Sequence, residues 1–288
     1  MWSSVPLPLF DTHTHFDVPD FDADRAEQAQ RAQQAGVQAL VLVGYLGAHF
    51  DRLIQTQHTL NLAHQAGRSP RAFVAAGLHP FYIVQHQPQD LATLDTVLAQ
   101  QACIAVGEIG LDTFTAEMKQ PSVYQAQKDL FSAQLALADA HDLPVMLHVR
   151  RAHADVLAIL KHHNFRHGGI AHAFSGGLQE AEALVKLGFK LGVTGQITNP
   201  NAKRLRHVVA HMGAAHWVLE TDCPDMTPLC CQQSHEHRTR NVPANLPYVL
   251  DGLAAVLNMK KDALAAKLWH NTQHCLRLDL PDDASFAH

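Results

Sequence analysis

The sequence predicts an α/β fold, a single (β/α)8 barrel with an extra helix at its C-terminal end. Eight short apolar runs alternate with longer segments of helical periodicity along the chain. The runs are continuously apolar, as in ALVLVG and PVMLHV, which is typical of strands covered by helices. No linker, repeat or composition break interrupts the 288 residues. We therefore expect residues 1–288 to form one domain of this kind, with 279–288 as a frayed tail.

The apolar runs give the positions of the expected strands. They are Pro8–Thr12, Ala39–Gly44, Ala72–Gly77, Cys103–Glu108, Pro144–His148, Gly169–Phe174, Lys190–Gly195 and Trp217–Asp222. A long irregular loop, Pro224–Val242, is followed by two helical segments, Pro243–Leu257 and Lys260–Leu276. A doubly wound sheet is the competing architecture. It requires a glycine-rich phosphate turn after an early strand, and the sequence has none.

Composition excludes several classes of protein. The chain is 47% hydrophobic, yet no apolar run reaches the roughly 18–20 residues that a membrane span needs. Its first ten residues, MWSSVPLPLF, lack the basic start and cleavage site of a signal peptide. Five cysteines without CxxC spacing indicate reduced thiols, and a net charge of −5 disfavours non-specific binding to duplex nucleic acid. We expect a cytoplasmic protein that does not contact the membrane.

Histidines and carboxylates end five of the expected strands. With 22 histidines in the chain, the two HxH triplets, His13/His15 and His235/His237, carry no weight alone. A single buried histidine or glutamate at a strand end is usually a hydrogen-bonded core residue. The C-terminal ends of barrel strands meet at one mouth, however, where six such residues would converge as divalent-metal ligands. They are His13, His15, Glu108, His148, His172 and Asp222, with Glu220 facing the same side as a supporting group.

Several motifs in order along the chain resemble the TatD family of metal-dependent DNases, in the amidohydrolase superfamily. They are FDTHTHFD, GLHP, AVGEIGLD, PVMLHVR, HAFSG, ETDCP, RNVP and a late NT pair. The runs LETDCPDM and HVRR are most similar to a YjjV-like branch of that family. Together the motifs cover nearly the whole chain.

The resemblance implies a divalent-metal phosphodiesterase that trims single-stranded DNA from its 3′ end. It implies two ions, Mg, Mn or Zn, sharing the carboxylate of Glu108. Asp222 would also orient or deprotonate the attacking water, so Glu108 and Asp222 are the expected catalytic residues. The ion ligands implied are His13, His15, Glu108 and Asp222 for one ion and Glu108, His148 and His172 for the other.

Two positions depart from the pattern of the family. Cys223 stands where alanine or serine is common, and Val149 stands where serine, threonine or cysteine is common. Neither departure removes a ligand. A thiol beside the site favours softer ions or makes activity sensitive to oxidation, unless Cys223 is only a small filling residue.

Charge placement indicates an anionic substrate. Seven cationic side chains fall in the loops expected at the barrel mouth: Arg150, Arg151, Lys203, Arg204, Arg206, Arg238 and Arg240. Arg150 and Arg240 are the expected phosphate contacts, together with His79. Phe81 and Tyr82 follow His79 and are placed to stack on a base of single-stranded DNA.

Two other functions remain open at this point. A metal-dependent amidohydrolase or lactonase acting on a small molecule would use the same barrel, although such enzymes usually bridge their ions with a carboxylated lysine that the Glu108 strand lacks. A metal-binding or scaffold protein without catalysis is the other alternative. No heptad run or edge-strand feature demands an obligate protein partner, so we expect a monomer.

Overall fold

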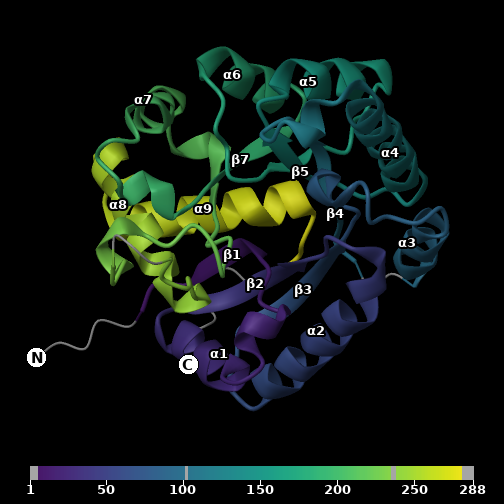
Figure 1. The fold of residues 1–288 in the computed structure, drawn as a ribbon. Helices are drawn as coiled ribbons and strands as arrows, with labels where there is room; N and C mark the ends of the chain where they lie inside the picture. The colour runs from purple at the N-terminus through teal and green to yellow at the C-terminus, as the bar shows by residue number, and fades with distance from the viewer. Residues whose placement is uncertain (1–5, 101–102, 235–237, 281–288) are drawn as a thin grey trace, which may run out of the picture.

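The computed structural model describes residues 6–100, 103–234 and 238–280. One eight-stranded parallel sheet runs in the order β1 to β8 and curls into a nearly closed barrel. Figure 1 shows α1 to α8 following one another around the strands in chain order, with α9 crossing the middle. The expected (β/α)8 fold is confirmed.

The strands and helices have the following bounds. The strands are β1 Leu9–Thr14, β2 Val37–Val43, β3 Arg71–Ala76, β4 Ala105–Asp112, β5 Val145–Arg150, β6 Gly169–Ala171, β7 Phe189–Val193 and β8 Trp217–Leu219. The α-helices are α1 Arg25–Gln34, α2 Phe50–Gln65, α3 Asp90–Ala99, α4 Pro121–Ala140, α5 His153–His162, α6 Leu178–Lys186, α7 Lys203–Met212, α8 Leu246–Leu257 and α9 Lys261–Leu276.

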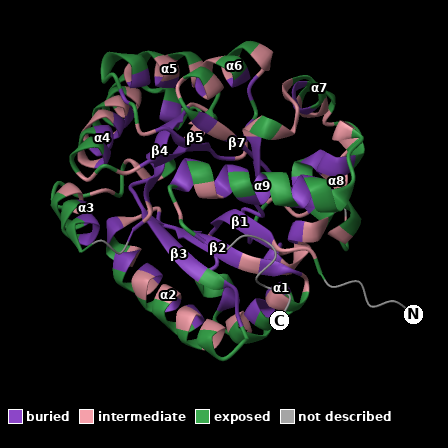
Figure 2. Ribbon diagram, turned by 180° about the vertical axis from the view of Figure 1, so that it is seen from behind, coloured by how far each residue is buried: buried purple, intermediate pink, exposed green. Residues whose placement is uncertain are grey.

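The strands are apolar on both faces because both faces are covered. In β2, Val41 and Val43 point into the barrel and join a core with Phe73 and Ile170. Leu40, on the opposite face, joins the larger core beneath the surrounding helices. Figure 2 shows this as buried strands enclosed by helices whose outer faces are exposed. Successive side chains of a strand point to opposite faces, so a continuously apolar strand supplies the core inside the barrel and the core beneath the helices in turn.

The barrel closes where β8 meets β1. The backbone N–H of Asp222 donates to the carbonyl of His13 at 2.9 Å, and that of His15 donates to the carbonyl of Cys223 at 2.8 Å. The hydroxyl of Thr12 donates to the carbonyl of Leu219 at 3.0 Å. This seam brings the first and last motifs of the sequence together at the C-terminal ends of the strands.

Helix α9 covers the opposite, N-terminal end of the barrel. Trp269 of α9 packs on Phe10 at the start of β1, with ring centroids 5.6 Å apart, and Cys275 and Leu276 extend the same interior core. In the view of Figure 2, α9 crosses in front of the strands. Because this end is filled with apolar side chains, the polar residues at the other end form the accessible mouth.

Some element boundaries differ from the sequence prediction. β4 continues to Asp112, whereas β6 ends at Ala171 and β8 at Leu219, before the proposed ligands that follow them. Ala173 and Asp222 have φ angles of 41° and 55°, so the chain leaves the sheet at these points.

The segments around the long loop and the C-terminus largely follow expectation. The loop 224–242 contains a short 3-10 helix, Leu229–Cys231, and Pro243–Asn245 precedes α8 as a further 3-10 turn. The second HxH triplet, His235/His237, and most of the tail expected at 279–288 lie outside the described residues. In the described ranges, no helix is long and apolar enough to cross a membrane.

Candidate metal centre

The six proposed ligands converge at the C-terminal mouth of the barrel. His13 lies at the end of β1 and His15 just beyond it, while Glu108 lies within β4 and His148 within β5. The remaining two, His172 and Asp222, follow β6 and β8. Each of the four histidines has a ring nitrogen within 4.0 Å of a carboxylate oxygen of Glu108 or Asp222.

The carboxylate of Glu108 separates the histidines into two groups. Its Oε2 lies 3.1 Å from Nε2 of His13 and 3.6 Å from Nε2 of His15. Its Oε1 lies 2.7 Å from Nδ1 of His148 and 4.0 Å from Nε2 of His172. One carboxylate oxygen therefore faces each group, which is the arrangement of a bridging ligand.

Asp222 completes the first group from the other side of the mouth. Its Oδ1 lies 3.7 Å from Nε2 of His15, 3.9 Å from Nε2 of His13 and 3.5 Å from Nε2 of His172. Its side chain is 11% exposed, whereas that of Glu108 is 2% exposed. Asp222 is thus the carboxylate of the pair that a water molecule in the mouth reaches.

The residues fit a divalent cation. Both ring nitrogens of His13 are buried without a hydrogen-bond partner among the residues that the structure describes, which costs free energy. Nε2 faces Glu108 and Asp222 and is the nitrogen that a bound cation would complete. Three sets of ligand atoms lie within 4.8 Å of one another: His13, His15 and Asp222; His79, Glu108 and His148; and His13, His172 and Glu220. Imidazole and carboxylate together suit zinc, manganese and magnesium.

The electrostatics of the site keep both carboxylates ionised. Burial opposes ionisation of Glu108, but its interactions with the imidazoles of His79, His172 and His13 outweigh burial and hold its pKa well below the usual range. Burial would also raise the pKa of Asp222, but the interaction with His172 outweighs burial and lowers it. Both groups therefore carry the negative charge that a cation requires.

The histidines differ in charge when no cation is bound. Burial is outweighed at His15 and at His148 by hydrogen bonds to carboxylates, which raise the pKa of each to about 9. At His13, burial and the neighbouring His172, whose ring stacks at 3.5 Å, lower the pKa. Metal binding must therefore displace protons from His15 and His148.

Two further carboxylates orient the histidines from behind. Asp112, at the end of β4, accepts from Nε2 of His148 at 2.9 Å. Glu220, fully buried, lies 3.1 Å from Nδ1 of His172 and accepts from the backbone N–H of Ala173 at 2.5 Å. The sequence prediction set Glu220 in this supporting position but missed Asp112, although its spacing of four residues from Glu108 along one strand was a usable signal.

A buried polar network holds the turn that carries Asp222. The carboxylate of Asp11 accepts from the backbone N–H of Thr221 at 2.8 Å and from its hydroxyl at 2.6 Å. The amide of Asn241 donates to the carbonyl of Thr221 at 2.9 Å. Burial raises the pKa of Asp11 to about 8. These partners fix the left-handed backbone at Asp222, where φ is 55°.

His79 lies closer to the ligands than the sequence indicates. Its Nε2 is 3.4 Å from Oε1 of Glu108 and 3.1 Å from Nδ1 of His148, and its Nδ1 accepts from the N–H of Phe81. Burial lowers its pKa to about 4. The imidazole is therefore neutral and belongs to the same cluster as the second ligand group.

A cavity of about 700 Å³ opens over the cluster. One side is aromatic: Phe81 is exposed, and Tyr82 contacts Tyr45 with ring centroids 5.2 Å apart. Arg150 also lines the cavity, and its guanidinium lies 3.5 Å above the ring of Phe114. The predicted contacts Phe81, Tyr82, His79 and Arg150 thus share one cavity with the ligands.

The other expected cations are mostly engaged elsewhere. Arg240 forms a bidentate pair with Asp24, at 3.0 and 2.5 Å, and does not line the cavity. Arg204 donates to the carbonyls of Ser175 and Gly176, and Arg206 to that of Ile197. The expectation that Arg240 faces the mouth is wrong, because acidic residues near α1 take up its guanidinium.

Cys223 is fully buried beside the centre. Burial and the nearby Asp11 raise the pKa of its thiol well above the usual value, so it is not a thiolate. Val149, the second departure noted above, packs partly buried against the core beneath the helices.

Comparison with known proteins identifies the family. The model of a family described as TatD related DNase matches residues 10–277. The chain belongs to the TatD family. Its relatives are metal-dependent hydrolases, so the chain is an enzyme of that class.

Individual members of the TatD family align over nearly the full length. The metal-dependent hydrolase YjjV of Escherichia coli K12 is 38% identical over 266 residues, covering 92% of this chain and 96% of the relative. The crystal structure of YjjV superposes with a TM-score of 0.83 at 36% identity, covering 94% and 98%. A protein of Erwinia amylovora named 3′-5′ ssDNA/RNA exonuclease TatD is 31% identical, covering 90% and 96%.

Proposed function

We propose that this TatD-family hydrolase is a two-metal phosphodiesterase that removes nucleotides from the 3′ end of single-stranded DNA. The proposed ions are divalent, Mg, Mn or Zn. The proposed ligands are His13, His15, Glu108 and Asp222 for one ion and Glu108, His148 and His172 for the other. The placement of His79 beside Oε1 of Glu108 makes it a further candidate ligand of the second group.

The observation that carries the proposal is the position of Glu108 between two groups of histidines. Each carboxylate oxygen lies nearest to a different group, at 3.1 Å from His13 and 2.7 Å from His148. A site for one ion has no need of ligands on both sides of a single buried carboxylate. Two divalent ions held by these residues would lower the pKa of a water molecule and stabilise the charge on a phosphodiester.

The residues of the chain supply the proton transfer and the orientation. Asp222 is ionised and reaches the cavity, so it is placed to accept the proton of an attacking water. Asp112 and Glu220 fix the rings of His148 and His172. Because the network from Asp11 holds the turn, Asp222 keeps its position as it accepts the proton of the water.

The cavity lining supports an oligonucleotide substrate. Phe81 and Tyr82 offer aromatic surface at one side, and base–aromatic stacking contributes about 1–3 kcal/mol per base. Arg150 is exposed at the same cavity and has no carboxylate within ion-pair distance in the described part of the chain. The name of the Erwinia relative, an exonuclease on single-stranded DNA and RNA, adds support.

An amidohydrolase or lactonase bridged by a carboxylated lysine has less support. Within the eight described strands, Lys190 in β7 is the only lysine, and its ammonium donates to the carbonyl of Ala215 at 2.7 Å. It lies away from the cavity over the metal centre.

The test follows a single-stranded oligonucleotide labelled at its 5′ end. Protein stripped of metal is given Mg, Mn or Zn in turn, alongside Glu108→Gln and Asp222→Asn, with an RNA oligonucleotide in parallel. We expect a metal-dependent ladder that shortens from the 3′ end and disappears in both variants. Intact DNA, together with Glu108-dependent hydrolysis of a lactone or cyclic amide, would overturn the nuclease assignment while leaving the metal centre in place.

A further inference from the structure

A second pocket lies beside the metal centre, between the loops that follow β7 and β8. It has a volume of about 630 Å³, and we call it the amide pocket after Gln196, Asn199 and Asn201 on one of its walls. It shares Gln196, Asp225, Met226 and Arg238 with the cavity over the metal centre. The two pockets are therefore neighbours, and a substrate whose phosphodiester lies at the metal centre has the amide pocket beside it.

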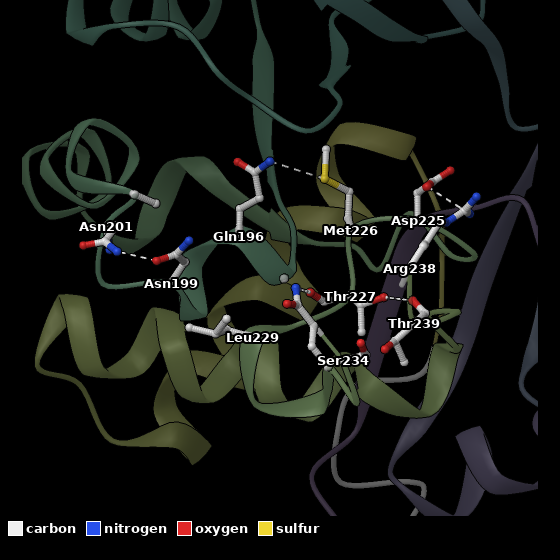
Figure 3. Close-up of a pocket in the computed structure, with 13 residues that line it drawn as sticks. Gln196, Asn199, Asn201, Asp225, Met226, Thr227, Leu229, Ser234, Arg238 and Thr239 are labelled. Carbon is white, nitrogen blue, oxygen red and sulfur yellow. Dashed lines mark hydrogen bonds and ion pairs between the residues drawn. The ribbon is translucent and has the colours of Figure 1, made fainter. Parts of the chain in front are cut away.

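Side-chain amides on one wall of the amide pocket have donors and acceptors that are not used in hydrogen bonds within the described part of the chain. Figure 3 shows Gln196, Asn199 and Asn201 on one side of the pocket, with Asp225, Met226 and Arg238 opposite. The side-chain oxygen of Asn199 accepts from the N–H of Asn201 at 2.9 Å, and its amide nitrogen has no partner in the described ranges. The side chain of Gln196 makes only a long contact with the sulfur of Met226, at 3.5 Å, within the same ranges.

The walls of the pocket are fixed against each other. A Cβ atom on Gly195 would lie 2.2 Å from the carbonyl oxygen of Met226 and 2.7 Å from the nitrogen of Pro228, so only glycine permits this approach. The hydroxyl of Thr198 donates to the carbonyl of Gly195 at 2.6 Å and accepts from the N–H of Leu229 at 2.8 Å. These contacts hold the loop after β7 against the loop after β8 beneath the amide pocket.

The charge of the lining disfavours a phosphate group. Arg238 is the only cationic side chain that lines the amide pocket in the part of the chain that the structure describes. Its guanidinium pairs with the carboxylate of Asp225 at 2.9 Å. A neutral group with both donors and acceptors along one edge matches the amides better, and in an oligonucleotide that group is the base.

We propose that the amide pocket holds one nucleobase of the single strand and reads its hydrogen-bonding edge. The inference rests on the proposed nuclease function and adds a base preference to it. A side-chain amide carries one donor and one acceptor, which pair with complementary groups of a base edge. Phe81 and Tyr82, on the aromatic side of the catalytic cavity, stack on any base, because every base has a π-face.

The experiment compares oligonucleotides that differ in one base at each position near the 3′ end in turn. kcat/KM is measured with saturating metal for the unmodified enzyme, Gln196→Met and Asn199→Ala. We expect a preference of about tenfold for one base at one position, lost in the variants because the amide contacts are gone. Hydrolysis of bis(4-nitrophenyl) phosphate, which is too small to fill both pockets, reports whether the metal centre of each variant is intact.

The variant Phe81→Ala is the matched control on the aromatic side. It should lower kcat/KM for all four bases alike and leave the base preference in place. Equal rates for all bases in the unmodified enzyme, or a preference that persists in both amide variants, would overturn the inference while the exonuclease function stands. If the unmodified enzyme hydrolyses the small diester but leaves every oligonucleotide intact, the proposed function fails, and the base-reading inference fails with it.

Discussion

Replacing Glu220 by glutamine tests whether a residue that does not reach the cavity controls the metal centre. The carboxylate lies 3.1 Å from Nδ1 of His172 and accepts from the N–H of Ala173. Glu220→Gln keeps the shape of the side chain and an acceptor for Ala173. It removes the negative charge of Glu220. Burial alone would lower the pKa of His172, and this charge helps to raise it. The oxygen 3.1 Å from Nδ1 of His172 is the one that accepts from Ala173, so the variant keeps this oxygen and takes away only the charge that holds the ring.

The expected magnitude follows from this geometry. Removing the outer partner of a metal-binding histidine typically lowers metal affinity about 10- to 100-fold, or roughly 1.4–2.7 kcal/mol. Oε2 of Glu220 has no hydrogen-bond partner in the described ranges, so a glutamine NH2 group there is a buried donor without an acceptor. That group lowers the free energy of unfolding by about 1–3 kcal/mol.

Metal affinity is measured by competition with a chromophoric chelator, and unfolding by urea in the presence of EDTA. Asn271→Ala is the matched control, because Asn271 is buried and its amide donates to the carbonyls of Ala214 and Trp217, at the far end of β8. It should lower stability and leave metal affinity unchanged. Gly192→Ala should act like Glu220→Gln, since its Cβ would lie 2.2 Å from Oε1 of Glu220.

The orienting role of Glu220 is refuted if Glu220→Gln binds metal as tightly as the unmodified protein does. It is also refuted if Asn271→Ala weakens metal binding as much as Glu220→Gln does at equal loss of stability. In that case general destabilisation, and not the orientation of His172, would account for the effect.

Three further outcomes are expected. In the metal-free enzyme the pKa values of His15 and His148 are raised to about 9, so both are protonated at neutral pH and must lose their protons to bind metal. Affinity should rise about tenfold per pH unit for each proton displaced, up to about pH 9 for the protons of His15 and His148. His172, whose pKa is raised well above its usual value, adds a further proton. Calorimetry in two buffers of different ionisation enthalpy counts the protons, and none released would contradict the assignment. Asp112→Asn removes a hydrogen bond that raises the pKa of His148, so NMR titration of the metal-free variant should give a pKa below about 9. A thiol reagent should modify the exposed Cys230 in the folded protein and spare Cys223, which is buried and has a pKa well above the usual value. Mass spectrometry of peptides distinguishes the two cysteines. Rapid labelling of Cys223 would show that the seam between β8 and β1 opens.

The strands and the gathering of histidines and carboxylates at one mouth were predictable because both depend on local patterns. Continuous apolar runs such as that of β2 mark strands buried on both faces, and a parallel barrel brings the C-terminal ends of its strands to one mouth. His13 and Asp222 are separated by more than two hundred residues, yet each lies at or just beyond a strand end. Their convergence therefore follows from the fold class.

The partners of these groups were decided only by the tertiary structure. No pattern in the sequence says that the two oxygens of Glu108 face different histidines, or that Asp112 accepts from His148 across two strands. Arg240 shows the same limit, because its guanidinium pairs with Asp24, 216 residues away, instead of facing the mouth. Side-chain pairing depends on which surfaces pack together, and the distances that decide it exist only once the barrel has closed.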